Sequence, residues 1–178
     1  MVDYPSRRSP RLKDYDYRQY GAYFVTICIH ERKCILGAIK DGEMELSVPG
    51  KIVLEEWERI VLHRPTVELD GFVVMPNHVH GIVVLRGDTL ETVKTDRASP
   101  VPTKTKSPAG SLSAVVGGYK SAVTRRINML RQTPGAVVWQ SRFHDHIIRN
   151  ESDLNRIREY VLYNPARWEQ DIFYSVDS

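Results

Sequence analysis

Two strand-like runs that follow each other almost directly constrain the fold of this chain more than any other feature. They span 67–75 and 79–85, are rich in valine, and are separated by Pro76-Asn77. Other segments surround this pair. They are a β-branched and aromatic run at 23–29, an amphipathic helix pattern at 51–62, a helix pattern at 112–131 that Gly117-Gly118 interrupts, and a short strand at 146–148.

The order strand, helix, strand, strand, helix, strand predicts an α+β fold. We expect a ferredoxin-like split βαβ sandwich, with an antiparallel sheet and helices on one face, as a single domain over 1–178. The remaining segments are peripheral to that pattern. They are a basic arm at 1–17, a small hairpin at 35–46 around Asp41-Gly42, a flexible polar loop at 86–108, a short strand at 137–139 and a last helix from the N-cap Ser152 to Tyr163, stopped by Asn164-Pro165.

Charge is unevenly distributed along a chain whose formal net charge is only +3. The segment 117–150 carries six Lys/Arg against a single acid, Asp145, which suits a polyanion-binding face, although a solvated surface explains it equally well. The two cysteines, Cys28 and Cys34, make no disulfide framework. The cations at 6–18 precede no apolar segment of a signal peptide, and no apolar run approaches the roughly 20 residues that cross a bilayer. We therefore expect a cytoplasmic protein without a membrane partner.

The pair His78 and His80 is the first candidate site. Residues two apart on a strand point to the same face, so both imidazoles face one side while Val79 packs inward. Two neutral imidazoles can hold a divalent metal that has further ligands and open positions. The alternative is a pair of surface or hydrogen-bonded histidines.

The last helix carries the second candidate site. Arg156, Tyr160 and Asn164 are four residues apart and share a face, and Tyr160 is expected to point away from the apolar stripe of the same helix. A phenol is a weak nucleophile that becomes competent when a metal polarises the phosphate under attack. The alternative is that Tyr160 packs on the sheet and Asn164 caps the helix.

The third feature is the segment 139–146, in which aromatic residues alternate with arginine and amides. This composition suits single-stranded nucleic acid, although a strand with a packed Trp139 and Phe143 would look the same. His144 and His146 repeat the His-x-His spacing, so they are a rival metal pair.

Together these features resemble the REP-associated tyrosine transposases, members of the single-tyrosine HUH nuclease superfamily. The resemblance runs from about Arg11 to Trp168. It rests on the blocks RLKDYDYRQYGAYFVTICI, FVVMPNHVHGIVV, GGYKSAVTRRIN and VWQSRFHDHIIRNESDLNRIREYVLYNPARW, of which the second and the last are the specific ones.

The resemblance implies a role for individual residues. His78 and His80 fall on the metal-binding HUH pair, Tyr160 on the nucleophile, and Asn164 on the third metal position, while Tyr163 is a decoy. It implies Mg²⁺ or Mn²⁺ as cofactor, single-stranded or hairpin DNA as partner, and a 5′-phosphotyrosine intermediate; it leaves a homodimer open. The side chains predicted to contact DNA are basic, aromatic or amide. They are Arg11, Lys120, Arg125, Arg126, Trp139, Gln140, Arg142, Arg149 and Arg156.

Two other functions compete with this hypothesis. A domesticated relative would bind structured DNA without cutting it. The basic segment 117–150 is the feature that motivates this hypothesis. A ferredoxin-like RNA-binding domain would prefer RNA and would be indifferent to replacement of His78.

Overall fold

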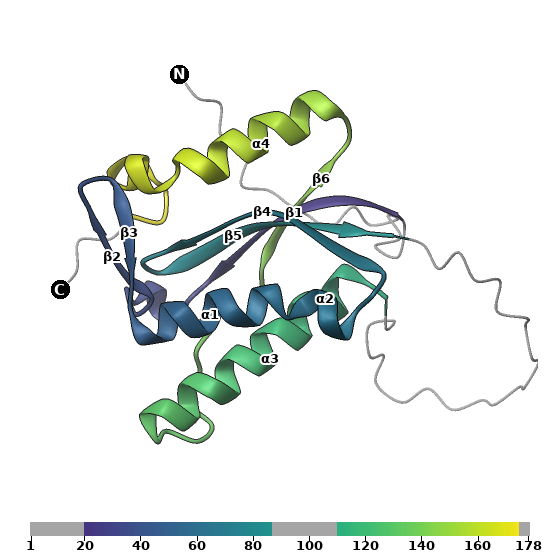
Figure 1. Cartoon of the computed structure of the whole chain (residues 1–178). Coiled ribbons are helices and arrows are strands. Elements are labelled where there is room, and N and C mark those ends of the chain that lie inside the picture. Colours follow the sequence, from purple (N-terminus) through teal and green to yellow (C-terminus); the bar gives the residue numbers. More distant parts are fainter. Residues whose placement is uncertain (1–19, 87–109, 175–178) are drawn as a thin grey trace, which may run out of the picture.

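The computed structural model describes residues 20–86 and 110–174 (Figure 1). The predicted arm at 1–17 with Arg11 lies outside these residues, as does the predicted loop at 86–108 except for Arg86. A four-stranded sheet forms the centre, with the order β4-β5-β1-β6 and antiparallel pairing between all neighbours. Its strands are β1 (Gly21–Cys28), β4 (Val67–Met75), β5 (His78–Leu85) and β6 (His144–Ile148).

The topology confirms the ferredoxin-like split βαβ prediction. A helical segment links β1 to β4, and β5 lies between them in the sheet. The helices of this segment are α1 (Val48–Glu58) and the short α2 (Ile60–His63), and α3 (Leu112–Arg131) links β5 to β6. In the described part of the chain, no helix is both long and apolar enough to cross a membrane.

The sheet is covered on both faces, so the prediction of helices on one face is wrong for the last helix, α4 (Glu151–Tyr163) (Figure 1). Tyr23, Val25 and Ile27 point into the main core with α1 and α3, whereas Phe24 points the other way and packs with Ile157 of α4. Successive side chains of a strand alternate between faces, and β1 is apolar at both sets of positions. Both faces therefore require cover.

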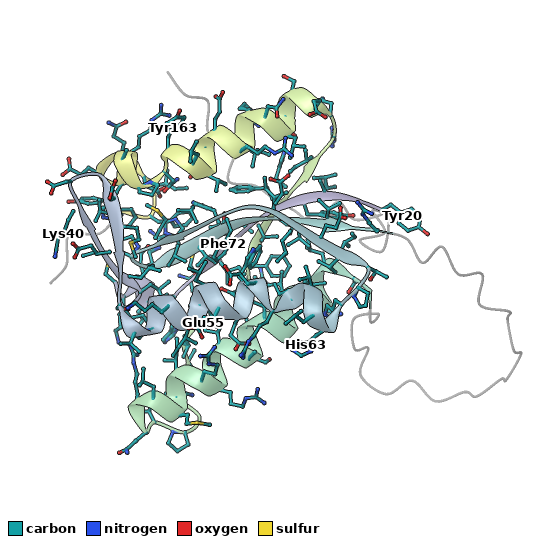
Figure 2. The ribbon with its side chains drawn as sticks, viewed as in Figure 1. Tyr20, Lys40, Glu55, His63, Phe72 and Tyr163 are labelled. Carbon is teal, nitrogen blue, oxygen red and sulfur yellow. The ribbon has the colours of Figure 1, made fainter. Side chains whose placement is uncertain are left out.

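The main core also explains a glycine inside the histidine strand. The ring of Trp57 on α1 stacks on Phe72 of β4, with centroids 4.4 Å apart and close to β5. Figure 2 shows Phe72 between the sheet and the helices below it. A Cβ atom at Gly81 would lie 2.3 Å from the Trp57 ring, so this position accepts no larger side chain without a shift of the indole.

The peripheral elements agree with the prediction in part. The hairpin of β2 (Gly37–Lys40) and β3 (Glu43–Leu46) is confirmed, and its turn residues Asp41 and Gly42 both have positive φ. Other details are corrected. Helix α3 continues through Gly117-Gly118, the N-cap of α4 is Asn150 rather than Ser152, 137–139 forms only the isolated bridge Trp139–Ile29, and the 3-10 turns η1 (His30–Arg32) and η2 (Pro165–Gln170) were not predicted.

Candidate active site

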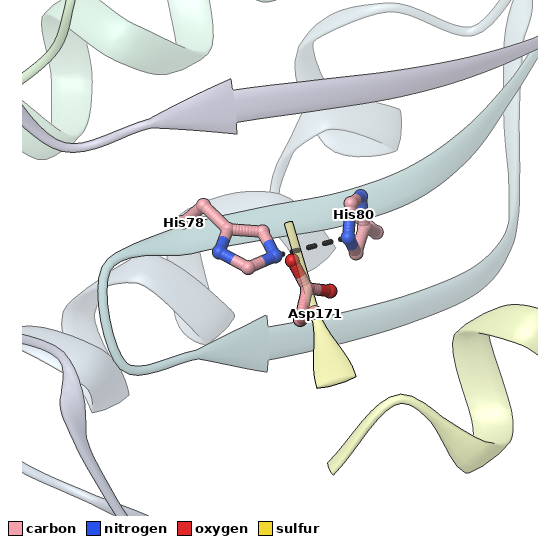
Figure 3. A group of neighbouring side chains, drawn as sticks. All are labelled: His78, His80 and Asp171. Atoms are coloured by element: carbon pink, nitrogen blue, oxygen red, sulfur yellow. Dashed lines mark hydrogen bonds between the residues drawn. The ribbon is translucent and has the colours of Figure 1, made fainter. Parts of the chain in front are cut away.

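His78 and His80 lie side by side on the face of β5 that α4 and η2 cover (Figure 3). Their Nε2 atoms are 2.9 Å apart, and Val79 between them is buried in the main core as predicted. Metal–imidazole bonds are about 2.1 Å long, so neighbouring nitrogen ligands of one ion are about 3 Å apart. The spacing of the two Nε2 atoms therefore fits a shared divalent ion.

Two neighbouring side chains orient the imidazoles. Asn77 Nδ2 donates to the carbonyl of Phe173 (2.9 Å), which turns Asn77 Oδ1 toward His78 Nδ1 (2.8 Å). An amide oxygen only accepts, so Nδ1 of His78 carries the proton and Nε2 keeps its lone pair. Thr26 Oγ1 lies 2.8 Å from His80 Nδ1 and can donate or accept. Contacts of this kind are typical of metal-binding histidines, and our sequence reasoning assigned neither Asn77 nor Thr26.

Both histidines are held neutral by their surroundings. His78 is 0% and His80 1% exposed. Burial lowers the pKa of His80 to about 3, and burial with the proximity of His80 lowers the pKa of His78 well below its usual value. A neutral imidazole is the form that binds a metal, so no proton has to leave before the pair can act as ligands.

These shifts make the metal-free protein sensitive to acid. The pKa of a histidine is about 6.5 in the unfolded chain. Below that pH, His78 and His80 bind protons in the unfolded state but stay neutral in the folded state. Stability is complete above about pH 6.5 and falls as the pH decreases, by about 2 kcal/mol per histidine between pH 6.5 and 5. Urea unfolding with a chelator at these two pH values measures the loss.

The matched variants isolate the histidine contribution to this loss. His80→Gln should remove about half of it, whereas replacing the exposed His63 by glutamine should leave it unchanged. An equal pH dependence of the wild-type protein and His80→Gln would contradict the assignment.

Asp171 is the acidic group that lies beside the histidines. It was not predicted, because it follows η2, an element without a clear sequence pattern. Ligand atoms of His78, His80 and Asp171 all lie within 4.8 Å of one another (Figure 3). Asp171 Oδ1 accepts from the backbone N–H of Phe173 (2.7 Å), and burial raises the pKa of the Asp171 carboxyl. This group offers the oxygen ligand that a divalent ion would add to two imidazoles.

Asn164, the residue expected at the third metal position, is buried beside Asp171. Its side chain is hydrogen-bonded to the Asp171 carboxyl, yet within the described residues its own Oδ1 has no hydrogen-bond partner. A buried amide oxygen without a partner is unfavourable unless a ligand satisfies it. Two oxygen donors, the Asp171 carboxylate and the Asn164 amide, are therefore buried next to each other in this part of the structure.

Tyr160 connects the two candidate sites, the last helix and the histidine pair. Its hydroxyl lies 3.3 Å from His80 Nε2 and 3.4 Å from Asp171 Oδ2. The expectation that Tyr160 points away from the apolar stripe is wrong, because its ring packs edge-on against Phe24 in the same cluster as Ile157. Tyr163 is 51% exposed on the outer side of α4 (Figure 2).

The segment after η2 closes the site. The Phe173 ring lies 4.7 Å from the His78 ring and 6.2 Å from the His80 ring, between centroids. The Trp168 ring also lies 5.9 Å from the His78 ring, between centroids. Both imidazoles are inaccessible to solvent, so a ligand as large as a phosphate group reaches them only after side chains that cover them move.

The rival pair is not part of the His78, His80 and Asp171 cluster, although the His144 ring lies 6.4 Å from the Phe173 ring between centroids. His144 is exposed on β6, and His146 Nε2 is 2.8 Å from Asp153 Oδ2. Arg156 also binds Asp153, at 2.7 Å. On the same face of α4, one turn further along, Tyr160 contacts His80. His146 thereby joins β6 to the first turn of α4, a contact that orients the tyrosine helix.

The structure corrects two of the predicted DNA contacts. Trp139 is only 4% exposed and packs in the main core, so its ring offers no face to a base. Arg126 binds Glu55 (2.6 Å) and Glu56 (2.8 Å), so its charge is already compensated. In both cases, the sequence showed the residue type but not the neighbour that engages it.

The other predicted DNA contacts lie at or near the surface. Lys120, Arg125 and Gln140 line an open groove of about 820 Å³ between α3 and the segment 134–141. Lys120 Nζ donates to the carbonyls of Gln140 (2.7 Å) and Ser141 (3.1 Å), which fixes one wall of this groove. Arg142 and Arg149 are exposed on the segment that enters and leaves β6.

Comparison with solved structures defines the class of fold. The chain matches the structure of a REP-associated tyrosine transposase bound to a REP hairpin with a TM-score of 0.57 and 22% identity, over 88% of this chain and 74% of that chain. Its fold is thus that of a REP-associated tyrosine transposase. A crystal structure from Deinococcus radiodurans R1 is more distant, with a TM-score of 0.46 and 16% identity over 84% of this chain and 93% of that chain.

Comparison of sequences gives the family. An uncharacterized protein of Haemophilus influenzae (strain Rd) is 38% identical over 175 residues, which cover 94% of this chain and 93% of that protein. The chain belongs to the same family as this Haemophilus influenzae protein. No family model matches the sequence.

Proposed function

We propose that this protein is a metal-dependent single-strand DNA endonuclease of transposase type, which cleaves and rejoins DNA near hairpins through a 5′-phosphotyrosine intermediate. One observation carries the proposal. The hydroxyl of Tyr160 on α4 lies 3.3 Å from Nε2 of His80 on β5, next to a second imidazole and a carboxylate. A nucleophile, a metal-ligand set and an acidic group therefore meet at one point, as the chemistry requires.

The donor set suits Mg²⁺ or Mn²⁺, and two imidazoles favour Mn²⁺ of the two. His78 and His80 would supply nitrogen ligands, and Asp171 with Asn164 Oδ1 the oxygen ligands. When bound, the cation polarises the phosphate that is attacked and offsets the charge that develops on it.

The residues of the chain supply the remaining chemistry. The Tyr160 oxygen attacks phosphorus, the bond from phosphorus to the 3′ oxygen breaks, and the leaving oxygen takes a proton from water to become a 3′-hydroxyl. The phenolic proton passes toward Asp171 Oδ2, which lies 3.4 Å from the Tyr160 hydroxyl. Rejoining reverses these steps, with a 3′-hydroxyl attacking the phosphotyrosine.

Hairpin DNA is the proposed partner. The solved relative in fold is bound to a REP hairpin, and this chain exposes cations on the β6 segment and in the α3 groove that suit phosphates. Because Tyr160 and the histidine pair meet within one chain, the proposed reaction does not require a homodimer.

Formation of a covalent adduct tests the function. We expect a labelled DNA hairpin with single-stranded flanks to form a denaturation-resistant adduct with the protein in Mn²⁺, and none with a chelator. Hairpin binding that weakens with salt, without any adduct in Mn²⁺ or Mg²⁺, would select the alternative of a DNA-binding protein without cleavage activity. Preference for a matched RNA hairpin would select the RNA-binding alternative.

A further inference from the structure

We propose that Arg32, on the turn η1, forms a binding site at the rim of the histidine pair for the phosphodiester group under attack. The inference rests on the proposed function and deepens it, since it assigns the residue that holds the phosphate oxygens. The ligand class is a phosphodiester anion of single-stranded DNA. Three features of the turn lead to this assignment: how it is anchored, how its backbone is bent, and what its guanidinium faces.

The turn is anchored to the strand connection that precedes His78. The N–H of Ile29 donates to the carbonyl of Asn77 (2.8 Å), and the N–H of Leu36 donates to the carbonyl of Pro76 (3.0 Å). On the other side, the N–H of His30 donates to the carbonyl of Val138 (2.8 Å). Arg32 is therefore carried on a backbone fixed to the same connection that orients the first imidazole, which is how a binding residue is held in place.

The backbone of the turn is strained at two consecutive positions. Glu31 and Arg32 both have a φ of 56°, in the left-handed region that residues other than glycine seldom occupy. Such a conformation is unfavourable for a residue with a Cβ atom and is concentrated at functional sites. Glu31 pairs with Lys33 (2.7 Å), while Arg32 forms no ion pair with a carboxylate among the described residues.

The Arg32 guanidinium faces the cover of the site. It lies over the Phe173 ring, 5.3 Å from its centroid, and that ring lies 4.7 Å from the His78 ring. A phosphate that replaced Phe173 beside the imidazoles would meet this guanidinium.

Arginine is the side chain suited to this contact. Its planar donors pair with two oxygens of a phosphate at once, and this charge-assisted pair is among the strong hydrogen bonds. In the structure, the guanidinium of Arg32 lies over the Phe173 ring, where the proposed phosphate would bind. An aromatic face attracts a cation in this way when no anion is bound to it. Arg32 thus has a stacking partner when the site is closed and a phosphate partner when DNA is bound.

A double-mutant cycle between protein and DNA tests the proposal. Affinity is measured by fluorescence anisotropy in Mn²⁺ with the Tyr160→Phe protein, so that cleavage does not enter, on a hairpin with a single-stranded flank. A neutral methylphosphonate replaces one phosphate at a time along the flank. We expect Arg32→Gln to weaken binding of the natural DNA about tenfold and to have little effect when one particular phosphate is already neutral.

Arg167→Gln is the matched control, because Arg167 also stacks on an aromatic ring, that of Tyr163, at 5.9 Å. Its effect should be the same at every flank position, and Arg32→Lys should retain part of the coupling. Thermal unfolding checks that each variant is folded.

Coupling at no position, or equal coupling for Arg32 and Arg167, would overturn the assignment. If the wild-type protein still forms the covalent adduct, either of these results would reject the Arg32 site but not the proposed cleavage function. Selective coupling without any wild-type adduct would reject the cleavage reaction and keep the phosphate site.

Discussion

Replacing Tyr160 with phenylalanine is expected to abolish the covalent protein–DNA adduct, lowering its rate of formation by at least about 1,000-fold. The substitution removes one oxygen, the one that lies 3.3 Å from His80 Nε2. The ring keeps its edge-on contact with Phe24, at 5.9 Å between centroids, so the fold and the position of α4 should be retained. The loss would therefore report chemistry rather than packing. Single-turnover adduct formation in Mn²⁺, followed on a denaturing gel, measures it.

Tyr163→Phe is the matched control on the same helix. This phenol is half exposed on the outer side of α4. Adduct formation should be within about twofold of the wild-type rate, since no residue of the proposed site depends on it. An adduct that survives Tyr160→Phe and disappears in Tyr163→Phe would transfer the nucleophile to residue 163.

Replacing His80 with alanine is expected to weaken Mn²⁺ binding by at least about 100-fold, measured by isothermal titration calorimetry or by the electron paramagnetic resonance of free Mn²⁺. The pair offers two neutral nitrogens at a spacing of 2.9 Å, and the substitution leaves a single nitrogen ligand beside the oxygen donors. Thr26→Val should cause a smaller loss, about tenfold, because it removes the contact that orients His80 and leaves the ligand in place.

The rival pair provides the control for this experiment. His144→Ala and His146→Ala should leave Mn²⁺ affinity unchanged, since His144 is exposed and His146 is bonded to Asp153. Retention of Mn²⁺ binding in His80→Ala, with loss in His144→Ala, would move the metal site to β6. The variants Asp171→Asn and Asn164→Ala then show which oxygen donor the ion uses. Replacing the side chain that ligates the ion should reduce Mn²⁺ affinity more than replacing the other one.

The sequence was sufficient for the sheet because its strands carry local signals. The run 67–85 has two apolar strands and a turn, and the structure places β4 and β5 there within a residue of the prediction. The cover of the second face was mispredicted because helical periodicity shows that α4 has an apolar stripe but not which face of the sheet receives it. The N-cap was also misplaced, because Asn150 and Ser152 are both capping residues and only the backbone distinguishes them.

Some residues of the candidate site were predictable from the sequence, and others were not. His78, His80, Tyr160 and Asn164 were identified from spacing and resemblance, and the structure brings the first three together. Asp171, Asn77 and Thr26 had no such signal, since a single acid, amide or hydroxyl is common on any surface. Trp139 and Arg126 show the opposite error, in which a suitable residue type is already engaged by a partner distant in sequence.

The sequence by itself determined the order of the elements, the apolar faces and the side chains able to do chemistry, because these follow from residue type and from periods of two and 3.6 residues. Only the tertiary structure decided that a phenol from the last helix, two imidazoles from β5 and a carboxylate beyond η2 meet within hydrogen-bond distance, beneath the ring of Phe173. Contacts between residues 80 positions apart depend on how the layers pack, and no local pattern encodes that distance.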